Sequence, residues 1–566
     1  MTKTRGWKVL GALGGVALGF SLGGIERASA CGCLTPPDPS VPVVQAGERI
    51  VFAMADGNVT AHIQLQYSGP APDFGWLLPL PSQPTLELGT DELFNQLITA
   101  TQPKYKLTRV YAGSCSFGGG FRGGFAGAPS AANSPGGGED ASMGPSPLVI
   151  QSSIGPYDYA VLKADSKDAM LKWLADNHYF VPVGTDDSVA PYIRPNAFFL
   201  ALKLHSGANA GDLQPVVVKY PSDLPMIPIV LTSTGASQNM GIQVWMLGAG
   251  RAIPRNYYHT VLNDALLDWN NGAQNYNDVI IKAVGEANGK HSFVTEYAGV
   301  SSVLKGVLNA PNRFGNLAEL SSSPDAITFV DYLNQHGFTY TSQLVGVLAH
   351  YIPVPVALTA QNITPAQFYQ NISYWLGSYR NANQSQFLNY TMNYQPQMMA
   401  SDIDMRVIQP TLAAGALFDQ YPYLTRLYTT ISPADMNKDP VFSFNPSLPN
   451  WSNVHDGTLT YNCGFFSHSG VNDTPATLVT ADGWRVQYPG GVPSTFTPPP
   501  LPGSARIEIL SEEGPPVVVT DNTHVIGDGL GQGCSAALGG RAPTGGFAAL
   551  FLVGALALLL RRRRAA

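Results

Sequence analysis

Basic side chains are scarce in this sequence. It contains 32 Lys and Arg residues against 39 Asp and Glu residues, which gives a formal net charge of −7 at pH 7. Proteins that bind nucleic acids need clustered positive charge to neutralise phosphates. An acidic surface instead repels phosphate backbones and anionic lipid head groups. The composition therefore argues against nucleic acid as a partner.

The sequence also lacks the common catalytic motifs. Its ten histidines form no H-E-x-x-H or other i, i+4 ligand pair, and no G-x-S-x-G nucleophile elbow occurs. Asp73-Phe74-Gly75 matches the magnesium motif of kinases, but no H-R-D loop or A-P-E segment accompanies it. The G-x-G-x-x-G pattern at 118–123 lies in low-complexity sequence without a βαβ frame. We therefore predict no catalytic residue, no cofactor and no cofactor-binding residue.

The densest group of metal-capable side chains lies near the end of the folded part. His455 and His468 flank Cys463, and Asp456 follows His455. A metal site is the less favoured interpretation of this segment, and a polar loop that carries a disulfide is the favoured one. We therefore predict no metal ligand.

The N-terminus has the features of a secretory signal peptide. A positive n-region precedes an apolar, glycine-rich stretch over 9–24, and Ala28-Ser29-Ala30 is an A-x-A cleavage site. Residues 1–30 are thus predicted to be removed by signal peptidase after Ala30, which leaves Cys31 as the first residue. Lipidation of Cys31 is the alternative, although Ala28 stands where lipoproteins usually have leucine.

The C-terminus predicts a sorting tail over residues 534–566. A small-residue spacer follows Cys534, an apolar helix is predicted over 545–560, and Arg561–Arg564 follow it. Such an arginine cluster stays on the cytoplasmic side of a membrane. The apolar stretch has 16 residues, which gives about 24 Å of helix against a hydrocarbon core of about 30 Å. A span this short favours a tail that is removed after sorting.

These three parts, in this order, resemble the MYXO-CTERM sorting signal of myxobacterial surface proteins. The resemblance implies cleavage at Cys534 by a membrane-embedded sorting protease. The exported protein would then be anchored at the cell surface or outer membrane, through the tail or a lipid. The alternative is an inner-membrane protein whose folded part lies in the periplasm.

The exported part, residues 31–533, is more acidic than the whole chain. Removing both ends leaves 23 basic and 38 acidic side chains, a formal charge of −15. Four cysteines remain, namely Cys31, Cys33, Cys115 and Cys463. An even number in an oxidising compartment predicts up to two disulfides. Cys31 and Cys33 are too close for a comfortable mutual bridge, so we expect them to pair with Cys115 and Cys463. Free, buried thiols are the alternative.

The pattern along the exported part predicts an α+β fold with a β-rich first part and a helix-rich second half. Residues 31–113 are β-rich, with a hairpin of Ile50–Ala55 and Asn58–Tyr67 around Asp56-Gly57. Residues 114–147 are rich in Gly, Ser, Ala and Pro, which predicts a mobile insertion. Residues 148–480 continue as α+β and become helix-rich after 254. Residues 481–533 are rich in proline and glycine, which predicts an extended spacer.

Local signals place several elements within these parts. Thr90 is predicted to cap a helix, and Thr364-Pro365-Ala366-Gln367 is a capping box that predicts another, continuing to Gly377. Helices are also predicted over Ala326–Gln335 and Ser342–Tyr351. A strand is predicted over Ile227–Ser233.

Two separate segments resemble the DUF2330 family of uncharacterised bacterial exported proteins. The first contains an early Cys-Gly, then Asp56-Gly57, and then the run from Tyr67 through Asp73-Phe74-Gly75-Trp76 to Pro81. The second contains the run from Tyr423 to Thr430, followed by Met436 and the run from Asp439 to Phe442. The likeness spans roughly Cys31 to His468. The resemblance implies how far the family domain extends along the chain and that the domain is exported. Because the family has no established activity, the resemblance supplies no catalytic residue.

Arg426 is the most distinctive single residue, because it interrupts a run of apolar and hydroxyl side chains. Asp439 follows 13 positions later. We predict that Arg426 and Asp439 form a structural ion pair, with anion recognition by Arg426 as the functional alternative. The aromatic segments Tyr257-Tyr258 and Tyr421-Pro422-Tyr423 predict either a sugar-binding face or core packing.

These observations favour a non-enzymatic cell-envelope protein that binds a polysaccharide, a matrix component or another surface protein. The alternative is a secreted hydrolase that acts on an envelope or extracellular polymer, with carboxylates as acid and base. Two carboxyl groups facing each other across a cleft would support the hydrolase. An aromatic groove without such a pair would support binding.

Overall fold

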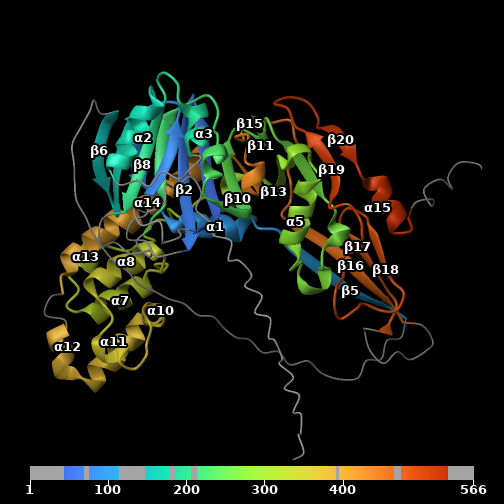
Figure 1. Cartoon of the computed structure of the whole chain (residues 1–566). Helices are drawn as coiled ribbons and strands as arrows, with labels where there is room; N and C mark the ends of the chain where they lie inside the picture. The colour runs from blue at the N-terminus through green and yellow to red at the C-terminus, as the bar shows by residue number, and fades with distance from the viewer. Residues whose placement is uncertain are drawn as a thin grey trace, which may run out of the picture.

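The computed structural model describes residues 44–68, 75–113, 147–177, 185–204, 213–390, 394–463 and 473–532. The predicted signal peptide, Cys31, Cys33, Cys115, all but the last residue of the insertion, and the tail with its helix over 545–560 lie outside these residues. The described part is a mixed α+β fold, which confirms the predicted class (Figure 1). None of its helices has the length and apolar character needed to cross a membrane.

A mixed ten-stranded sheet forms the centre of the molecule, in the order β20-β19-β12-β13-β14-β10-β1-β2-β9-β4. The strands of this sheet are β1 (Val44–Ala55), β2 (Asn58–Ser68), β4 (Thr85–Leu88), β9 (Val216–Pro221), β10 (Ala236–Gly248), β12 (Tyr258–Leu262), β13 (Ser292–Val300), β14 (Tyr423–Ile431), β19 (Ser504–Ile509) and β20 (Val517–Asp521). Ala55 pairs with Asn58 across Asp56 and Gly57, which have positive φ angles of 52° and 70°. The predicted two-residue hairpin is therefore confirmed.

Four layers are stacked around the middle of this sheet (Figure 1). On one face lie α1 (Asp91–Thr101) and α14 (Gln409–Gln420), whose apolar side chains pack on β1, β10 and β14. On the other face lies a second sheet, in the order β3-β8-β7-β6. Its strands are β3 (Gly75–Leu80), β6 (Leu148–Ile154), β7 (Tyr157–Lys163) and β8 (Phe198–Leu204). The outer face of that sheet is covered by α2 (Lys167–Asp176).

Residues 314–408 form a helical lobe with its own apolar core beside the central layers (Figure 1). Its helices are α6 (Leu317–Ser321), α7 (Ala326–Gln335), α8 (Ser342–Tyr351), α9 (Val356–Thr359), α10 (Pro365–Gln370), α11 (Ile372–Ala382), α12 (Gln384–Tyr390) and α13 (Pro396–Ile403). The predicted bounds of α7 and α8 and the capping box of α10 are confirmed. The predicted helix after Thr364 breaks at Asn371, so that α10 and α11 are separate helices.

A third region lies at the other end of the large sheet. There α5 (Tyr276–Gly285) packs on β12 and β13, and a four-stranded sheet follows in the order β18-β17-β16-β5. Its strands are β5 (Lys104–Ala112), β16 (Val454–Asn462), β17 (Ala476–Thr480) and β18 (Arg485–Tyr488). The remaining elements are α3 (Thr185–Val189), α4 (Ile229–Thr232), α15 (Thr523–Gly529), and the paired strands β11 (Arg251–Pro254) and β15 (Phe442–Asn445).

Two sequence predictions are wrong here. Residues 481–533 are not an extended spacer in their described part, because β18, β19, β20 and α15 fold there and β19 buries Ala505 and Ile507. The proline run that prompted the prediction lies in the irregular segment between β18 and β19. The strand predicted over Ile227–Ser233 is instead the short helix α4, in which the Thr232 N–H donates to the carbonyl of Pro228.

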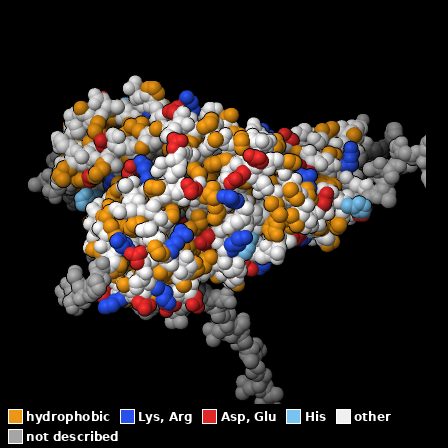
Figure 2. Space-filling model, turned by 90° about the horizontal axis from the view of Figure 1, so that it is seen from above, with side chains coloured by type: hydrophobic (Ala, Val, Ile, Leu, Met, Phe, Trp, Pro, Cys, Tyr) orange, Lys and Arg blue, Asp and Glu red, His pale blue; other side chains and the backbone are white. Residues whose placement is uncertain are grey.

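The helix-rich stretch predicted after 254 ends at Gln420, beyond which strands dominate. Seen from above, Lys and Arg side chains lie interspersed with Asp and Glu instead of forming one patch (Figure 2). That face therefore provides no continuous basic surface for a nucleic-acid backbone.

Candidate functional site

A polar pocket of about 440 Å³ opens on the α1 face of the large sheet, beyond the end of α1. Strands β1, β10, β13 and β14 contribute its floor, and its walls come from the segment that leads into β5, the start of β5, and the segment that leads into α5 with the first residues of that helix. The residues that line it are Gly47, Glu48, Arg49, Gln102, Pro103, Tyr105, Gly241, Gln243, Gly272, Ala273, Tyr276, Asn277, Glu296, Arg426 and Tyr428. The lining thus combines cations, carboxylates, amides and phenol groups in a cavity of ligand-binding size.

Paired glycines keep the floor of this pocket open. Gly47 of β1 lies opposite Gly241 of β10, so neither strand places a side chain there. A Cβ atom on Gly241 would lie 2.7 Å from the hydroxyl oxygen of Tyr428. That hydroxyl donates to Oδ1 of Asn277 at 3.2 Å, which ties β14 to the start of α5. Glycine at 241 is therefore required for the position of a tyrosine that lines the pocket.

Arg426 and Glu296 form a buried ion pair in this floor. The Nε atom of Arg426 donates to Oε2 of Glu296 at 2.5 Å, and the two residues are only 5% and 3% exposed. The Tyr276 hydroxyl donates to the other carboxylate oxygen of Glu296 at 2.7 Å. Because both oxygens of Glu296 have strong donors, the pair is held in one geometry.

The guanidinium of Arg426 also contacts the end of α1. Its Nη1 atom donates to the hydroxyl of Thr101 at 3.3 Å, and its Cζ atom lies 5.3 Å from the ring centre of Trp245. The same hydroxyl accepts from Nε1 of Trp245 at 3.0 Å and donates to the carbonyl of Leu97. Packing, a cation–π contact and hydrogen bonds therefore fix Arg426 between the sheet and α1.

A second guanidinium, that of Arg49, lies on the same face of the sheet. Its Nη1 atom donates to Oε1 of Gln64 at 3.1 Å, and Nε2 of Gln64 donates to Oδ1 of Asp91 at 2.5 Å. Burial and the neighbouring Arg426 lower the pKa of Arg49 from its usual value. A guanidinium nevertheless remains charged at any physiological pH, so the pocket presents two cations.

Tyr105 lies in the wall of the pocket. Its hydroxyl is the one polar side-chain group of the lining that is buried without a hydrogen-bond partner. Its ring stacks on His455 at 4.7 Å between ring centres and meets Trp269 edge-on at 5.3 Å. Burial raises the pKa of Tyr105 well above its usual value, with further contributions from Asp264 and Glu296. The phenol therefore stays protonated and can donate. Buried polar groups are rarely left without partners, so this hydroxyl marks a place for a ligand atom or water.

The predicted ion pair between Arg426 and Asp439 is not formed. Arg426 pairs with Glu296, whereas Asp439 accepts from the Tyr192 hydroxyl at 2.7 Å and from the Val230 N–H at 2.9 Å. The reason is topological, because Arg426 faces α1 while Asp439 lies after the strand, in a loop on the opposite face of the sheet. Arg426 is thus a residue of the pocket, and Asp439 belongs to a different region.

The other sequence candidates are also separated by the fold. Tyr257 packs in the core between the two sheets and Tyr421 packs under α1, so the two aromatic segments do not form one sugar-binding face. His455 bonds through Nδ1 to Oδ2 of Asp264 at 2.9 Å. Among the described residues, no group of three or more His, Cys, Asp or Glu side chains is placed to hold a metal ion, and His468 lies outside them.

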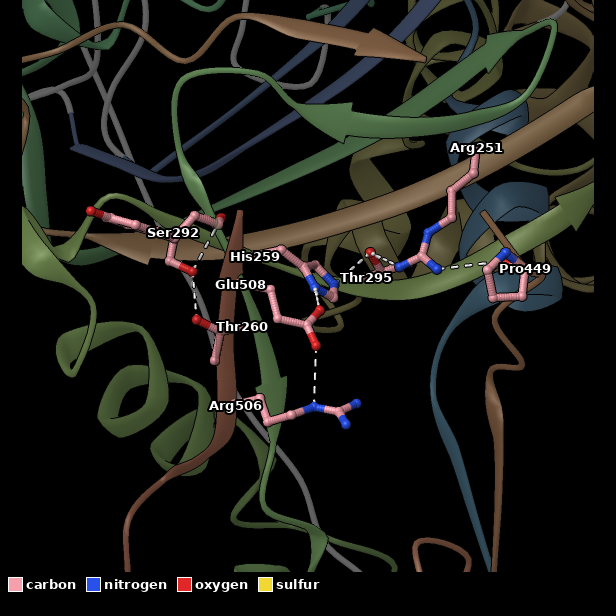
Figure 3. Close-up of polar contacts among 9 residues, drawn as sticks. Arg251, His259, Thr260, Ser292, Thr295, Pro449, Arg506 and Glu508 are labelled. Atoms are coloured by element: carbon pink, nitrogen blue, oxygen red, sulfur yellow. Dashed lines mark hydrogen bonds and ion pairs between the residues drawn. The ribbon is translucent and has the colours of Figure 1, made fainter. Parts of the chain in front are cut away.

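A second polar cluster lies in the core where β12, β13 and β19 meet (Figure 3). His259 is held between Glu508, 3.2 Å from its Nδ1 atom, and Thr295, 3.0 Å from its Nε2 atom. Arg251 donates to the Thr295 hydroxyl at 3.1 Å. A carboxylate, an imidazole and a hydroxyl in sequence resemble a hydrolase triad. However, His259 and Thr295 are each only 1% exposed, so a substrate cannot reach the hydroxyl.

Comparison with protein families matches residues 26–343 to the family described as "Uncharacterized protein conserved in bacteria (DUF2330)". The chain belongs to this family. The match covers more than half of the 566 residues, and it includes Arg49, Tyr105, Gly241 and Glu296 but ends before Arg426. No curated protein and no solved structure matches the chain. Membership of the DUF2330 family therefore assigns no activity to the chain.

Sequence reasoning identified Arg426 and missed the rest of the pocket. Glu296 precedes Arg426 by 130 positions, and they meet because β13 and β14 are neighbours. Tyr105 lies in a strand whose exposure alternates at its start, a weak signal for one buried aromatic side. Gly47 and Gly241 gave no local signal, because their role depends on the pairing of β1 with β10.

Proposed function

We propose that this member of the DUF2330 family is a non-enzymatic binding protein of the cell envelope, and that its polar pocket takes a hydroxyl-rich ligand such as a segment of a polysaccharide. The observation that carries the proposal is the buried Tyr105 hydroxyl, which lines the pocket and has no partner. Sugar hydroxyls both donate and accept, so they match a lining of guanidinium, amide and carboxylate groups. The three tyrosines of the lining add apolar faces with polar edges.

The carboxylates of the pocket favour binding over polymer hydrolysis. A glycosidase needs two carboxyl groups that flank the scissile bond, about 5–10 Å apart. Glu296 is held by Arg426 and Tyr276, so neither of its oxygens is left to act as acid or base without breaking the pair. Glu48 also contributes to the lining of the pocket, but its side chain alternates with that of Arg49 along β1, so it extends to the opposite face of the sheet, where it lines a second cavity together with Ile50. The hydrolase alternative therefore has no pair of facing carboxyl groups here.

The ends of the chain support delivery of this pocket to the outside of the cell. In the proposal, signal peptidase cleaves after Ala30, and a membrane-embedded protease processes the MYXO-CTERM-like tail at Cys534. The product is anchored at the cell surface, where polysaccharides or other surface proteins are the available partners. Intact mass of the protein from the cell envelope tests this route. A product that starts at Cys31 and lacks residues after Cys534 supports it, and retention of Arg561–Arg564 contradicts it.

Binding is tested with the full chain, extracted from the envelope in detergent and titrated with a panel of neutral and acidic oligosaccharides by calorimetry. We expect Tyr105→Phe to weaken binding of the best oligosaccharide about tenfold, because it removes one hydrogen bond worth about 1.4 kcal/mol. Tyr374→Phe is the matched control, since Tyr374 is 67% exposed on α11 in the helical lobe. Equal affinities for both variants, or no binding of any sugar by the unaltered chain, would refute the proposal.

A further inference from the structure

A second cavity lies between the two sheets, on the opposite face of β1 from the polar pocket. It has a volume of about 310 Å³. Its lining includes Ile50, Phe52, Ala61, Leu78, Leu80 and Tyr220. We refer to this cavity as the apolar chamber, since aliphatic and aromatic side chains and prolines make up most of that lining.

The walls of the apolar chamber belong to the main core of the protein. Ile50 and Phe52 of β1 and Ala61 of β2 are each only 2% exposed. They face Leu78 and Leu80 of β3 in the second sheet. Protein interiors are packed as densely as organic crystals, and voids larger than a water molecule are few. Cavities of half this volume with apolar walls stay dry and bind small hydrocarbons. A chamber of this size in the core therefore favours an apolar occupant.

The few polar groups of the apolar chamber restrict the class of occupant. The Tyr220 side chain lines it and makes no hydrogen bond within the described part of the chain. Burial raises the pKa of Tyr220, so its hydroxyl remains neutral. The Ser222 hydroxyl donates to the carbonyl of Leu224 at 3.0 Å and keeps the capacity to accept. A ligand with one hydroxyl or carbonyl group could satisfy these hydroxyls.

The charged groups argue against an anionic head group. Two carboxylates, Glu48 and Asp439, line the apolar chamber, against one guanidinium, that of Arg194. Arg194 is exposed to solvent, so its charge is screened by water. Asp439 is fixed by the Tyr192 hydroxyl and the Val230 N–H. A carboxylate or phosphate placed in the chamber would lie close to like charges in a poorly solvated region.

We propose that the apolar chamber is a second binding site, which takes an uncharged aliphatic group with a hydroxyl or ester end that hydrogen-bonds to Tyr220. A fatty alcohol or an esterified acyl chain belongs to this class. The site does not depend on the polar pocket, because the two lie on opposite faces of the large sheet and share only Glu48 among their lining residues.

The experiment titrates the full chain with 1-octanol and with octanoate, which have the same chain length and differ in charge. Calorimetry gives the affinities, and thermal unfolding checks the folded state. We expect 1-octanol to bind at least tenfold more tightly than octanoate. Ala61→Leu fills the apolar chamber and should abolish octanol binding, and Tyr220→Phe should weaken it about tenfold. The matched control is Ala382→Leu on α11, where the alanine is exposed and the change should have no effect.

If Ala61→Leu does not fold, Leu224→Trp blocks the chamber from a half-buried loop position and replaces it. Octanol binding that survives in the filled variant would place the ligand elsewhere and overturn the proposal. Octanoate binding as tight as octanol binding would show that Arg194 selects an anion, and would overturn the uncharged class. Absence of octanol binding to the unaltered chain would refute the site itself.

Discussion

The Nε atom of Arg426 lies 2.5 Å from Oε2 of Glu296, across neighbouring strands of the central sheet. Both residues are buried, and an isolated charge in such a place is costly. We expect Glu296→Gln or Arg426→Met to lower the free energy of unfolding by about 3–5 kcal/mol, because either change leaves an unpaired or poorly paired partner. Urea denaturation measures this change.

An exposed pair provides the control for this prediction. Arg255 and Glu512 lie 3.6 Å apart with about half of each side chain exposed. Breaking it by Glu512→Gln should change stability by about 0–1 kcal/mol. The double variant Glu296→Leu with Arg426→Met should regain part of the stability lost in the single variants. A loss of less than about 1 kcal/mol in both single variants would contradict the buried pair as described.

Tyr105 and Tyr157 should respond differently to loss of their hydroxyl groups. The Tyr157 hydroxyl donates to the carbonyl of Gln214 at 2.5 Å and accepts from its N–H at 2.8 Å, all within the core. Tyr157→Phe should therefore cost about 1–3 kcal/mol of unfolding free energy. Tyr105→Phe should leave stability unchanged or slightly raised, because its hydroxyl is buried without a partner. Thermal or urea unfolding of both variants in the absence of ligand checks this. A large loss in Tyr105→Phe would mean that its hydroxyl has a structural partner.

His62 should make the protein less stable as the pH falls. Burial, with a smaller effect of Lys219, lowers its pKa from 6.5 to about 4. Between these pH values the unfolded chain takes up a proton that the folded chain does not, so protonation favours unfolding. The stabilising contribution is complete above pH 6.5 and is lost as the pH drops toward 4, by about 3 kcal/mol.

The change His62→Gln isolates this contribution from that of the carboxylates. Urea midpoints between pH 7 and pH 4 should depend less on pH in this variant than in the unaltered chain. His524→Gln is the matched control, since the side chain of His524 is 84% exposed. Identical pH dependence in the unaltered chain and in His62→Gln would rule out the buried, neutral imidazole.

Local sequence signals predicted local structure well. The Asp56-Gly57 turn, the Thr90 cap and the bounds of α7 and α8 depend on contacts within a few residues, and the structure has them where the sequence placed them. The hydroxyl of Thr90 accepts from the Glu92 N–H at 3.2 Å, as expected for an N-cap. Such features follow from backbone chemistry and need no knowledge of the fold.

The pocket and the partner of Arg426 could not be predicted in the same way. Asp439 follows Arg426 by 13 positions in the sequence and was predicted to be its partner, but β14 directs Arg426 toward α1. The true partner comes from a strand that only the sheet order brings alongside. The spacer prediction failed for a related reason. The high proline content is typical of the irregular segment before β19, but it gives no sign that β19 and β20 pair at the edge of the large sheet.

Cys463 should form a disulfide with Cys115, which is narrower than the pairing expected from sequence. β5 and β16 run parallel with Ala112 opposite Asn462, and the Cys463 N–H donates to the carbonyl of Ala112 at 2.9 Å. Cys115 follows Ala112 by three residues, within reach of Cys463 along the chain. Peptide mapping of the exported protein without reduction should therefore yield a Cys115–Cys463 peptide, with Cys31 and Cys33 outside it. Peptides that link Cys463 to Cys31 or Cys33 would contradict this connectivity. A Cys115–Cys463 bridge leaves the Cys31 thiol outside this pairing and available for lipidation, whereas a bridge from Cys463 to Cys31 would exclude lipidation, so the same experiment constrains how the protein is anchored.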